Sequence, residues 1–183
     1  MFLMLEKAKS HTLQMVKKGD PKFSYLFRHI PEVEKWARDI ISLYPQADKE
    51  VVLFSVWMHD IGQVVKKDVH DHAVRSEVEV WRYLPGLGLS PEIIGKIAHC
   101  VRAHRCSDVQ PETLEAKILA VADSASHMTD FAYAAMALDG RLGEARGKLE
   151  RDYRDISLLS EVRLKTEPLY QAWKLLLDKY NSV

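Results

Sequence analysis

Apolar residues recur at helical spacing along most of this chain, and no convincing run of alternating β-branched residues interrupts them. The clearest segment covers residues 31–43, which opens with a proline and two acids and ends before Pro45. Because proline and acids are favoured in the first turn of a helix, we place the start of this helix at Pro31. By the same spacing, we expect the core to include the tryptophans Trp36, Trp57 and Trp81. The pattern predicts an all-α protein that folds as a compact helical bundle.

Further start and stop signals divide the rest of the chain. Asp48 is a good N-cap for a helix that Gly62 would end, and Ser90 marks another start. The predicted helices cover residues 31–43, 48–59, 71–84, 90 to at least 101, and 111–138, with one or two more after residue 140 and a kink or break at Pro168. No linker or internal repeat is visible, and 183 residues suit one domain. We therefore expect a single domain over residues 1–183, with a motif-bearing core at about 25–130 and a helical extension at 141–183.

The charge balance narrows the class of partner. The chain has 26 basic and 26 acidic residues, whereas proteins that bind nucleic-acid polymers usually show a basic excess or stripe. A small phosphorylated substrate needs only a few local cations, so it fits this charge balance. The sequence does not decide whether the chain forms a homo-oligomer.

The longest apolar stretches, such as residues 51–58, are too short to cross a bilayer, and the N-terminus lacks the features of a signal peptide. We expect a cytoplasmic protein with no membrane partner, in which Cys100 and Cys106 lie in a helix as reduced thiols.

Four residues fall at informative places relative to the predicted helices. His29 comes just before the helix at 31–43, and the tetrad His-Asp-Ile-Gly at residues 59–62 closes the next helix. Asp123 ends the stretch Lys-Ile-Leu-Ala-Val-Ala-Asp, where an apolar helix face meets a carboxylate. A His-Asp dipeptide alone means little, and the second one, at residues 70–71, lies in a polar stretch without this context. The informative feature is the order His, His-Asp, Asp on separate helices.

This order resembles the HD-domain phosphohydrolase superfamily, an all-α family with the same pattern. The resemblance covers about residues 25–130 and depends on the His-Asp-Ile-Gly tetrad and the Ala-Asp ending. It implies a divalent transition metal such as Mn, Fe, Co, Ni or Zn, held by His29, His59, Asp60 and Asp123. It also implies that a metal-bound hydroxide attacks the phosphorus of a nucleotide or related small phosphate ester. His59 and Asp60 would be the catalytic residues, with Asp60 a candidate proton acceptor.

The resemblance leaves the number of metal ions at one or two. Some branches of the superfamily bind a second metal through two further histidines, and His72 and His104 stand at corresponding places at helix ends. Ordinary exposed histidines at helix ends are the alternative reading of both residues.

The other histidines are weaker candidates. His127 follows Asp123 by one turn and could touch the site, although a residue so placed is more often a supporting or surface group. His99 is turned about 140° around the helix from His104, so we do not expect the two to converge. We interpret the remaining two, His11 and His70, as surface residues.

The residue that contacts phosphate cannot be carried over from the family. The superfamily often places a lysine directly after His-Asp-Ile-Gly, but this chain has Gln63 there. The candidates to replace that lysine are Lys66, Lys67, Arg75 and Arg105. For all four, a solvated surface charge is the alternative interpretation.

Two other functions stay open at this stage. A few HD-type proteins use a mixed-valent di-iron centre to oxidise a carbon substrate with dioxygen, and the same ligands would serve that chemistry. The third hypothesis is a metal-stabilised module that senses a nucleotide without catalysis, although degenerate modules usually lose one ligand. The region after Asp139 matches no pattern that separates these hypotheses.

Overall fold

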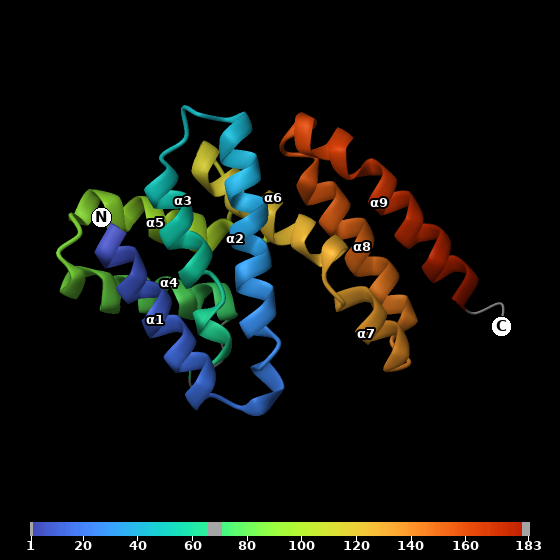
Figure 1. Cartoon of the computed structure of the whole chain (residues 1–183), viewed down its shortest axis with the longest axis horizontal. Coiled ribbons are helices and arrows are strands. Elements are labelled where there is room, and N and C mark those ends of the chain that lie inside the picture. Colours follow the sequence, from blue (N-terminus) through green and yellow to red (C-terminus); the bar gives the residue numbers. More distant parts are fainter. Residues whose placement is uncertain (1, 66–70, 181–183) are drawn as a thin grey trace.

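The computed structural model describes residues 2–65 and 71–180 and builds them mainly from helices (Figure 1). The α-helices are α1 (Phe2–Lys18), α2 (Leu26–Leu43), α3 (Lys49–Met58), α4 (His72–Tyr83), α5 (Pro91–Ala103), α6 (Leu114–Thr129), α7 (Ala132–Leu138), α8 (Leu142–Ile156) and α9 (Ser160–Lys179). Short 3-10 turns are η1 (Pro21–Phe23), η2 (Ile61–Gln63) and η3 (Leu84–Leu87). These ranges contain no strand, which confirms the predicted all-α class. Among the described helices, none is both long and apolar enough to cross a membrane.

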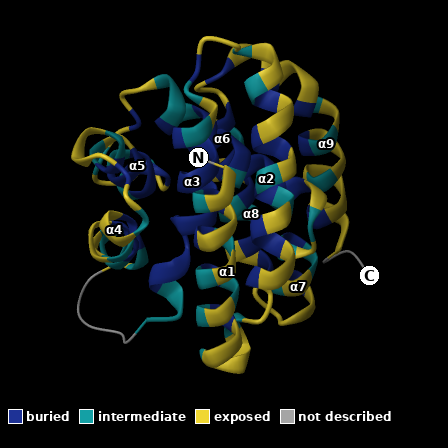
Figure 2. Ribbon diagram, turned by 60° about the vertical axis from the view of Figure 1, so that its left-hand side comes forward, coloured by how far each residue is buried: buried dark blue, intermediate teal, exposed yellow. Residues whose placement is uncertain are grey.

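The central element of the fold is α3. Its residues from Val51 to Met58 are all buried, and it contacts α1, α2, α5 and α6. Figure 2 shows this helix in dark blue, with more exposed helices around it. A helix that is apolar on every side must be covered by neighbours on every side. The residues that follow α3, His59 and Asp60, therefore also lie deep inside the protein.

The three C-terminal helices form a layer beside α6, on the side away from α4 and α5 (Figure 1). In this layer α8 contacts α6, α7 and α9. Tyr133 of α7 is fully buried, with its ring 5.2 Å from that of Trp173 on α9. Its hydroxyl donates a hydrogen bond of 2.7 Å to Asp152 on α8. Helices α8 and α9 make up most of the described chain after residue 140, and both contact α6.

The predicted helix starts at Asp48 and Ser90 are confirmed. Asp48 Oδ1 accepts hydrogen bonds from the backbone N–H groups of Glu50 and Val51 at the start of α3. Ser90 Oγ accepts one from Ile93 at the start of α5. Side chains of these types satisfy N–H groups that have no partner within the helix.

The predicted start of a helix at Pro31 is wrong, because α2 begins at Leu26 and contains Pro31. A proline inside a helix removes one backbone hydrogen bond. Leu26 and Ile30 are both fully buried one turn apart, and their burial offsets that loss. His29 consequently lies within α2 rather than before it. The last helix, α9, likewise continues through Pro168, so the chain does not break there.

The single helix predicted over residues 111–138 is two helices. α6 begins at Leu114 and ends at Thr129, and Asp130 then adopts an extended backbone. The Asp130 carboxylate accepts a hydrogen bond of 2.7 Å from the backbone N–H of Ala132, where α7 starts. Neither proline nor glycine marks this junction, so the apolar pattern runs through it unbroken.

Three smaller expectations are also wrong. Trp81 is 47% exposed because α4 is covered on one face, whereas the other two predicted core tryptophans are buried. Cys106 lies beyond α5 with a φ of 52°, outside any helix. His11 is half-buried and stacks on the ring of Tyr83, so it is not a surface residue. The prediction for His70 lies outside the described residues.

Candidate metal centre

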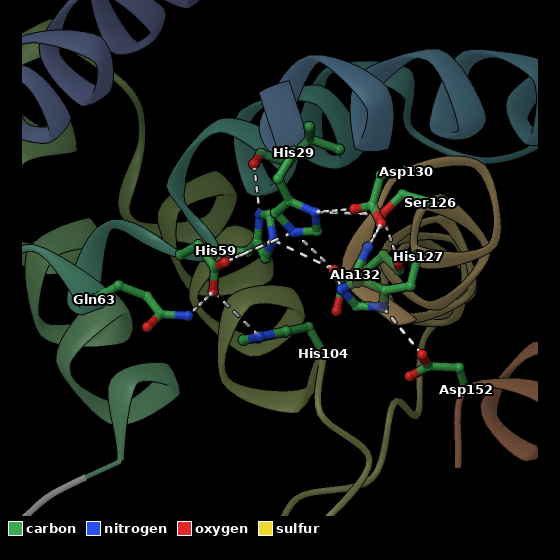
Figure 3. Close-up of polar contacts among 12 residues, drawn as sticks. His29, His59, Gln63, His104, Ser126, His127, Asp130, Ala132 and Asp152 are labelled. Carbon is green, nitrogen blue, oxygen red and sulfur yellow. Dashed lines mark hydrogen bonds and ion pairs between the residues drawn. The ribbon is translucent and has the colours of Figure 1, made fainter. Parts of the chain in front are cut away.

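The four residues of the predicted ligand set converge on one point at the end of α3. Figure 3 shows two of them, His29 and His59, with their rings close together. His29 Nε2 lies 3.1 Å from Asp123 Oδ1 and 3.7 Å from Asp60 Oδ2. His59 Nε2 lies 3.7 Å from each of the same two oxygens. Helices α2 and α6 and the turn after α3 supply these side chains, and the three helices pack against one another in the core. The order of motifs in the sequence therefore corresponds to a cluster in space.

The turn after α3 allows consecutive residues to face the same point. His59 still has helical backbone angles, but Asp60 leaves the helix with φ −108° and ψ 4°. Gly62 then lets α4 approach closely, since a Cβ there would lie 2.1 Å from the carbonyl oxygen of His72 and 2.6 Å from the backbone nitrogen of Ser76. Only glycine fits this contact, and the contact brings the start of α4 to the cluster.

The two additional predicted ligands form a second group around Asp60. His72 Nε2 lies 3.2 Å from Asp60 Oδ1, and His104 Nε2 lies 3.9 Å from the same oxygen. The two Nε2 atoms are 3.3 Å apart. Asp60 therefore presents Oδ2 to His29 and His59 and Oδ1 to His72 and His104. Asp60 could therefore supply one oxygen to each of two metal ions, one held with each group of histidines.

The orientation of the buried imidazoles fits metal binding. Nδ1 of His59 lies 2.7 Å from the carbonyl oxygen of Val56, and Nδ1 of His104 lies 2.7 Å from that of Val101. A carbonyl oxygen can only accept, so each Nδ1 carries the proton and each Nε2 keeps a lone pair directed at the cluster. His59 Nε2 is buried and has no hydrogen-bond partner among the residues that the structure describes. A buried nitrogen without a partner, facing two carboxylates, suits a cation between them.

The charges at the cluster also favour a cation. Burial lowers the pKa of His29, but the carboxylates of Asp123 and Asp130 outweigh this effect and raise it to about 10, and a metal ion at Nε2 would take the place of the proton that they stabilise. Burial raises the pKa of Asp60, yet the histidines around it hold that pKa well below its usual range. Burial and the neighbouring His59 lower the pKa of His104 to about 4, so this ring stays neutral, as a metal ligand must. The atoms of His29, His59 and Asp123, and those of Asp60, His72 and His104, each lie within 4.8 Å of one another, so each set could hold a metal ion.

One face of α6 brings further polar groups to the centre. The ring of His127 stacks on that of His29 with centroids 5.1 Å apart, and its Nε2 lies 3.8 Å from Asp123 Oδ1. On its other side, His127 Nδ1 faces Asp152 of α8 at 3.3 Å. Asp130 Oδ2 lies 3.7 Å from His29 Nδ1. Asp130 did not figure among the predicted site residues, although its spacing of one and two turns from His127 and Asp123 places all three on one face.

His99 lies outside the centre, as expected. Its Nε2 accepts a hydrogen bond from the backbone N–H of Glu112, 3.3 Å away, on the loop before α6.

The centre opens into a pocket of about 620 Å³. Of the predicted phosphate contacts, Arg105 lines this pocket and pairs with Asp71. Arg75 instead donates a hydrogen bond of 2.9 Å to the carbonyl of Gly62 and is not among the described lining residues. Lys66 and Lys67 lie outside the described residues.

Three lining cations were not predicted from the sequence: Arg28, Arg141 and Lys148. Arg28 directly precedes the candidate ligand His29 in the sequence, and this adjacency is the one signal that could have indicated Arg28 as a site residue. Arg141 and Lys148 come from the C-terminal layer, where no motif marks them.

Comparison with known proteins agrees with this geometry. The model of the HD domain matches residues 26–128, a range that contains all six candidate metal ligands. Searches of curated proteins and of solved structures found no match. HD domains bind divalent metals, and most members of the family are metal-dependent phosphohydrolases. Because the match spans more than half of the 183 residues, this chain belongs to the HD-domain family.

Proposed function

We propose that this chain is a metal-dependent phosphohydrolase that cleaves a nucleotide or a related small phosphate ester. The observation that carries the proposal is the position of Asp60, whose two oxygens face two separate groups of candidate ligands. Divalent ions held there would polarise a phosphoryl oxygen and lower the pKa of water at the site. The mixture of imidazole and carboxylate ligands suits Mn, Fe, Co, Ni or Zn.

The chain's own groups would hold and orient the reacting parts. His59 and His104 are fixed by the carbonyls of their own helices, so their Nε2 atoms need no rearrangement on metal binding. Asp60 is buried and central, and we assign it a second role as acceptor of the proton from the attacking water. Geometry that is fixed before the reaction avoids the cost of reorganising it during the reaction.

The cations at the pocket favour phosphate chemistry over oxidation. Arg28, Arg105, Arg141 and Lys148 all line it, and guanidinium groups match phosphoryl oxygens in geometry and charge. The six ligands would also suit a di-iron oxygenase, but a carbon substrate without charge has no need of this group of cations. A nucleotide-sensing module would use the cations, and only a catalytic assay separates it from a hydrolase.

The test begins with the metal content of the purified protein. It continues with a panel of phosphate esters, including nucleoside monophosphates and 4-nitrophenyl phosphate, assayed with Mn, Co, Ni and Mg added separately. We expect one or two ions per chain and release of inorganic phosphate with at least one transition metal. Iron together with substrate-dependent oxygen uptake, or metal binding without any hydrolysis, would reject the hydrolase in favour of the alternatives.

A matched pair of variants shows whether the activity belongs to this site. His104→Ala and His99→Ala change the same residue type at or near the end of α5, but only His104 faces the centre. We expect His104→Ala to lose hydrolysis and His99→Ala to retain it at matched helical circular dichroism.

A further inference from the structure

Besides the metal centre, the pocket has an apolar wall at α7. Ala132, Ala135 and Met136 of α7 line the pocket together with Phe131, which directly precedes that helix. All four residues lie beyond the range matched by the family, 26–128. The wall therefore lies outside the part of the chain that matches the HD domain.

The packing of α7 explains why it presents an apolar face to the pocket. Tyr133 and Ala137, one turn apart, are buried against the neighbouring helices and hold α7 in place. Ala132, Ala135 and Met136 are spaced three and four residues apart, so they share a different face of the same helix. None of them carries a charge or a hydrogen-bonding group, and the two alanines leave room in front of the wall.

Phe131, next to this wall, contacts a cationic side chain, that of Arg28. Phe131 is 63% exposed, and the guanidinium of Arg28 lies 4.8 Å from the centre of its ring. Arg28 also lines the pocket and precedes the ligand His29 in the sequence. The contact between Arg28 and Phe131 therefore links α2, which carries His29, to the start of α7.

We propose that Phe131 and α7 form a subsite for the non-phosphoryl part of the substrate, and that this part is a planar, weakly polar group such as an aryl ring or a nucleobase. The inference rests on the proposed function in placing the phosphoryl group at the metal centre. A volume of about 620 Å³ is far more than a phosphate needs and lies within the range of roughly 300–1,000 Å³ typical of small-molecule sites. Apolar side chains on one side and cations near the centre match a ligand with an anionic end and an apolar body.

The test compares substrates that differ in the body attached to phosphate. The rate constant kcat/KM is measured for 4-nitrophenyl phosphate and for glycerol phosphate in the wild type, in Phe131→Ala, and in Ala135→Trp, which fills the space before the wall. We expect the ratio of the two kcat/KM values to fall about tenfold in each variant, equivalent to about 1.4 kcal/mol at 25 °C. Leu138→Trp is the control, because Leu138 is an exposed α7 residue that does not line the pocket.

A binding measurement makes the subsite testable apart from catalysis. Calorimetry compares phenylphosphonate with methylphosphonate, neither of which is hydrolysed. Preferential binding of phenylphosphonate that weakens about tenfold in Phe131→Ala and Ala135→Trp would support the subsite even if the protein hydrolysed no phosphate ester. Hydrolysis and binding ratios that stay within twofold of wild type in both variants would overturn the subsite and leave the proposed hydrolase intact.

Discussion

The HD-domain core and the C-terminal layer line the same pocket in different ways. In the core, the candidate ligands are mostly buried, and His59 and His104 are fixed by backbone carbonyls. In the C-terminal layer, the pocket-lining cations are partly exposed: Arg141 is bound to Glu144, and Lys148 lies near Asp152 and near His127 of α6. Groups that perform chemistry need fixed geometry, whereas groups that recognise a substrate can adapt to it. We therefore expect substitutions in the core to affect the reaction and substitutions in the layer to affect selectivity and stability.

The largest expected effect comes from Asp60→Asn. The amide keeps the size of the side chain but removes its charge, so it is a poorer ligand and cannot act as a base. We expect hydrolysis to fall more than about a hundredfold, or about 2.7 kcal/mol of barrier, at matched metal content and helical circular dichroism.

Asp152→Asn is the matched variant in the C-terminal layer, since Asp152 is also buried but belongs to neither predicted ligand group. The fold-decrease in hydrolysis for Asp152→Asn should be at least tenfold smaller than the fold-decrease for Asp60→Asn. Equal losses of hydrolysis in the two variants would contradict the distinction between core and layer. An Asp60→Asn activity within about threefold of wild type, a barrier change of only ~0.65 kcal/mol, would reject the catalytic role of Asp60.

The next effect concerns stability and compares two glycines. Gly62→Ala would place a Cβ 2.1 Å from the backbone of α4. Helix α4 would therefore have to move away from the turn that contains residue 62. Overpacking of this kind costs about 1–3 kcal/mol, and we expect the upper end because the neighbouring atoms are backbone. The melting temperature should fall by about 6–12 °C for a loss of about 3 kcal/mol.

Gly143→Ala in α8 is the control, because no atom of the described residues lies within 4 Å of its added Cβ. Alanine is the better helix former by roughly 0.5–1 kcal/mol, so this variant should melt at the same or a higher temperature. A Gly62→Ala protein as stable as Gly143→Ala would show that α4 does not need its close contact with the turn.

A smaller effect separates the two ion positions within the core. His72→Ala removes one of the three residues of the second group, so the bound metal should fall from two ions toward one, with the second ion at least about tenfold weaker. Metal titration followed by elemental analysis measures both quantities. An active wild-type protein that holds a single ion would contradict the assignment of His72 and His104 as ligands.

The smallest effect is expected for Tyr133→Phe in α7. The change removes the hydrogen bond from the Tyr133 hydroxyl to Asp152, worth about 1–1.5 kcal/mol, and Asp152 retains Lys148 as a neighbour. The melting temperature should fall by about 2–6 °C while metal content stays the same. Loss of bound metal in this variant would show that the C-terminal layer supports the metal centre directly.

Local signals account for the parts of the fold that could be predicted. Asp48 and Ser90 mark helix starts because each side chain bonds N–H groups only two or three residues away. Pro31 misled the prediction because the burial of Leu26 and Ile30, which depends on distant helices, outweighs the local preference of proline. The N-terminal helix α1 was not predicted at all, although its apolar side packs on α3.

The sequence by itself determined the helical class of this protein and the order of its candidate ligands, His29, His59-Asp60 and Asp123, because periodicity and motif order are properties of the chain alone. Only the tertiary structure decided that Asp60 faces two ligand groups with different oxygens, and that Phe131 stands beside Arg28 at an apolar wall. The physical reason is that these contacts join residues far apart in the chain. Their geometry is set by how buried helices such as α3 and α6 pack, which spacing in the sequence does not specify.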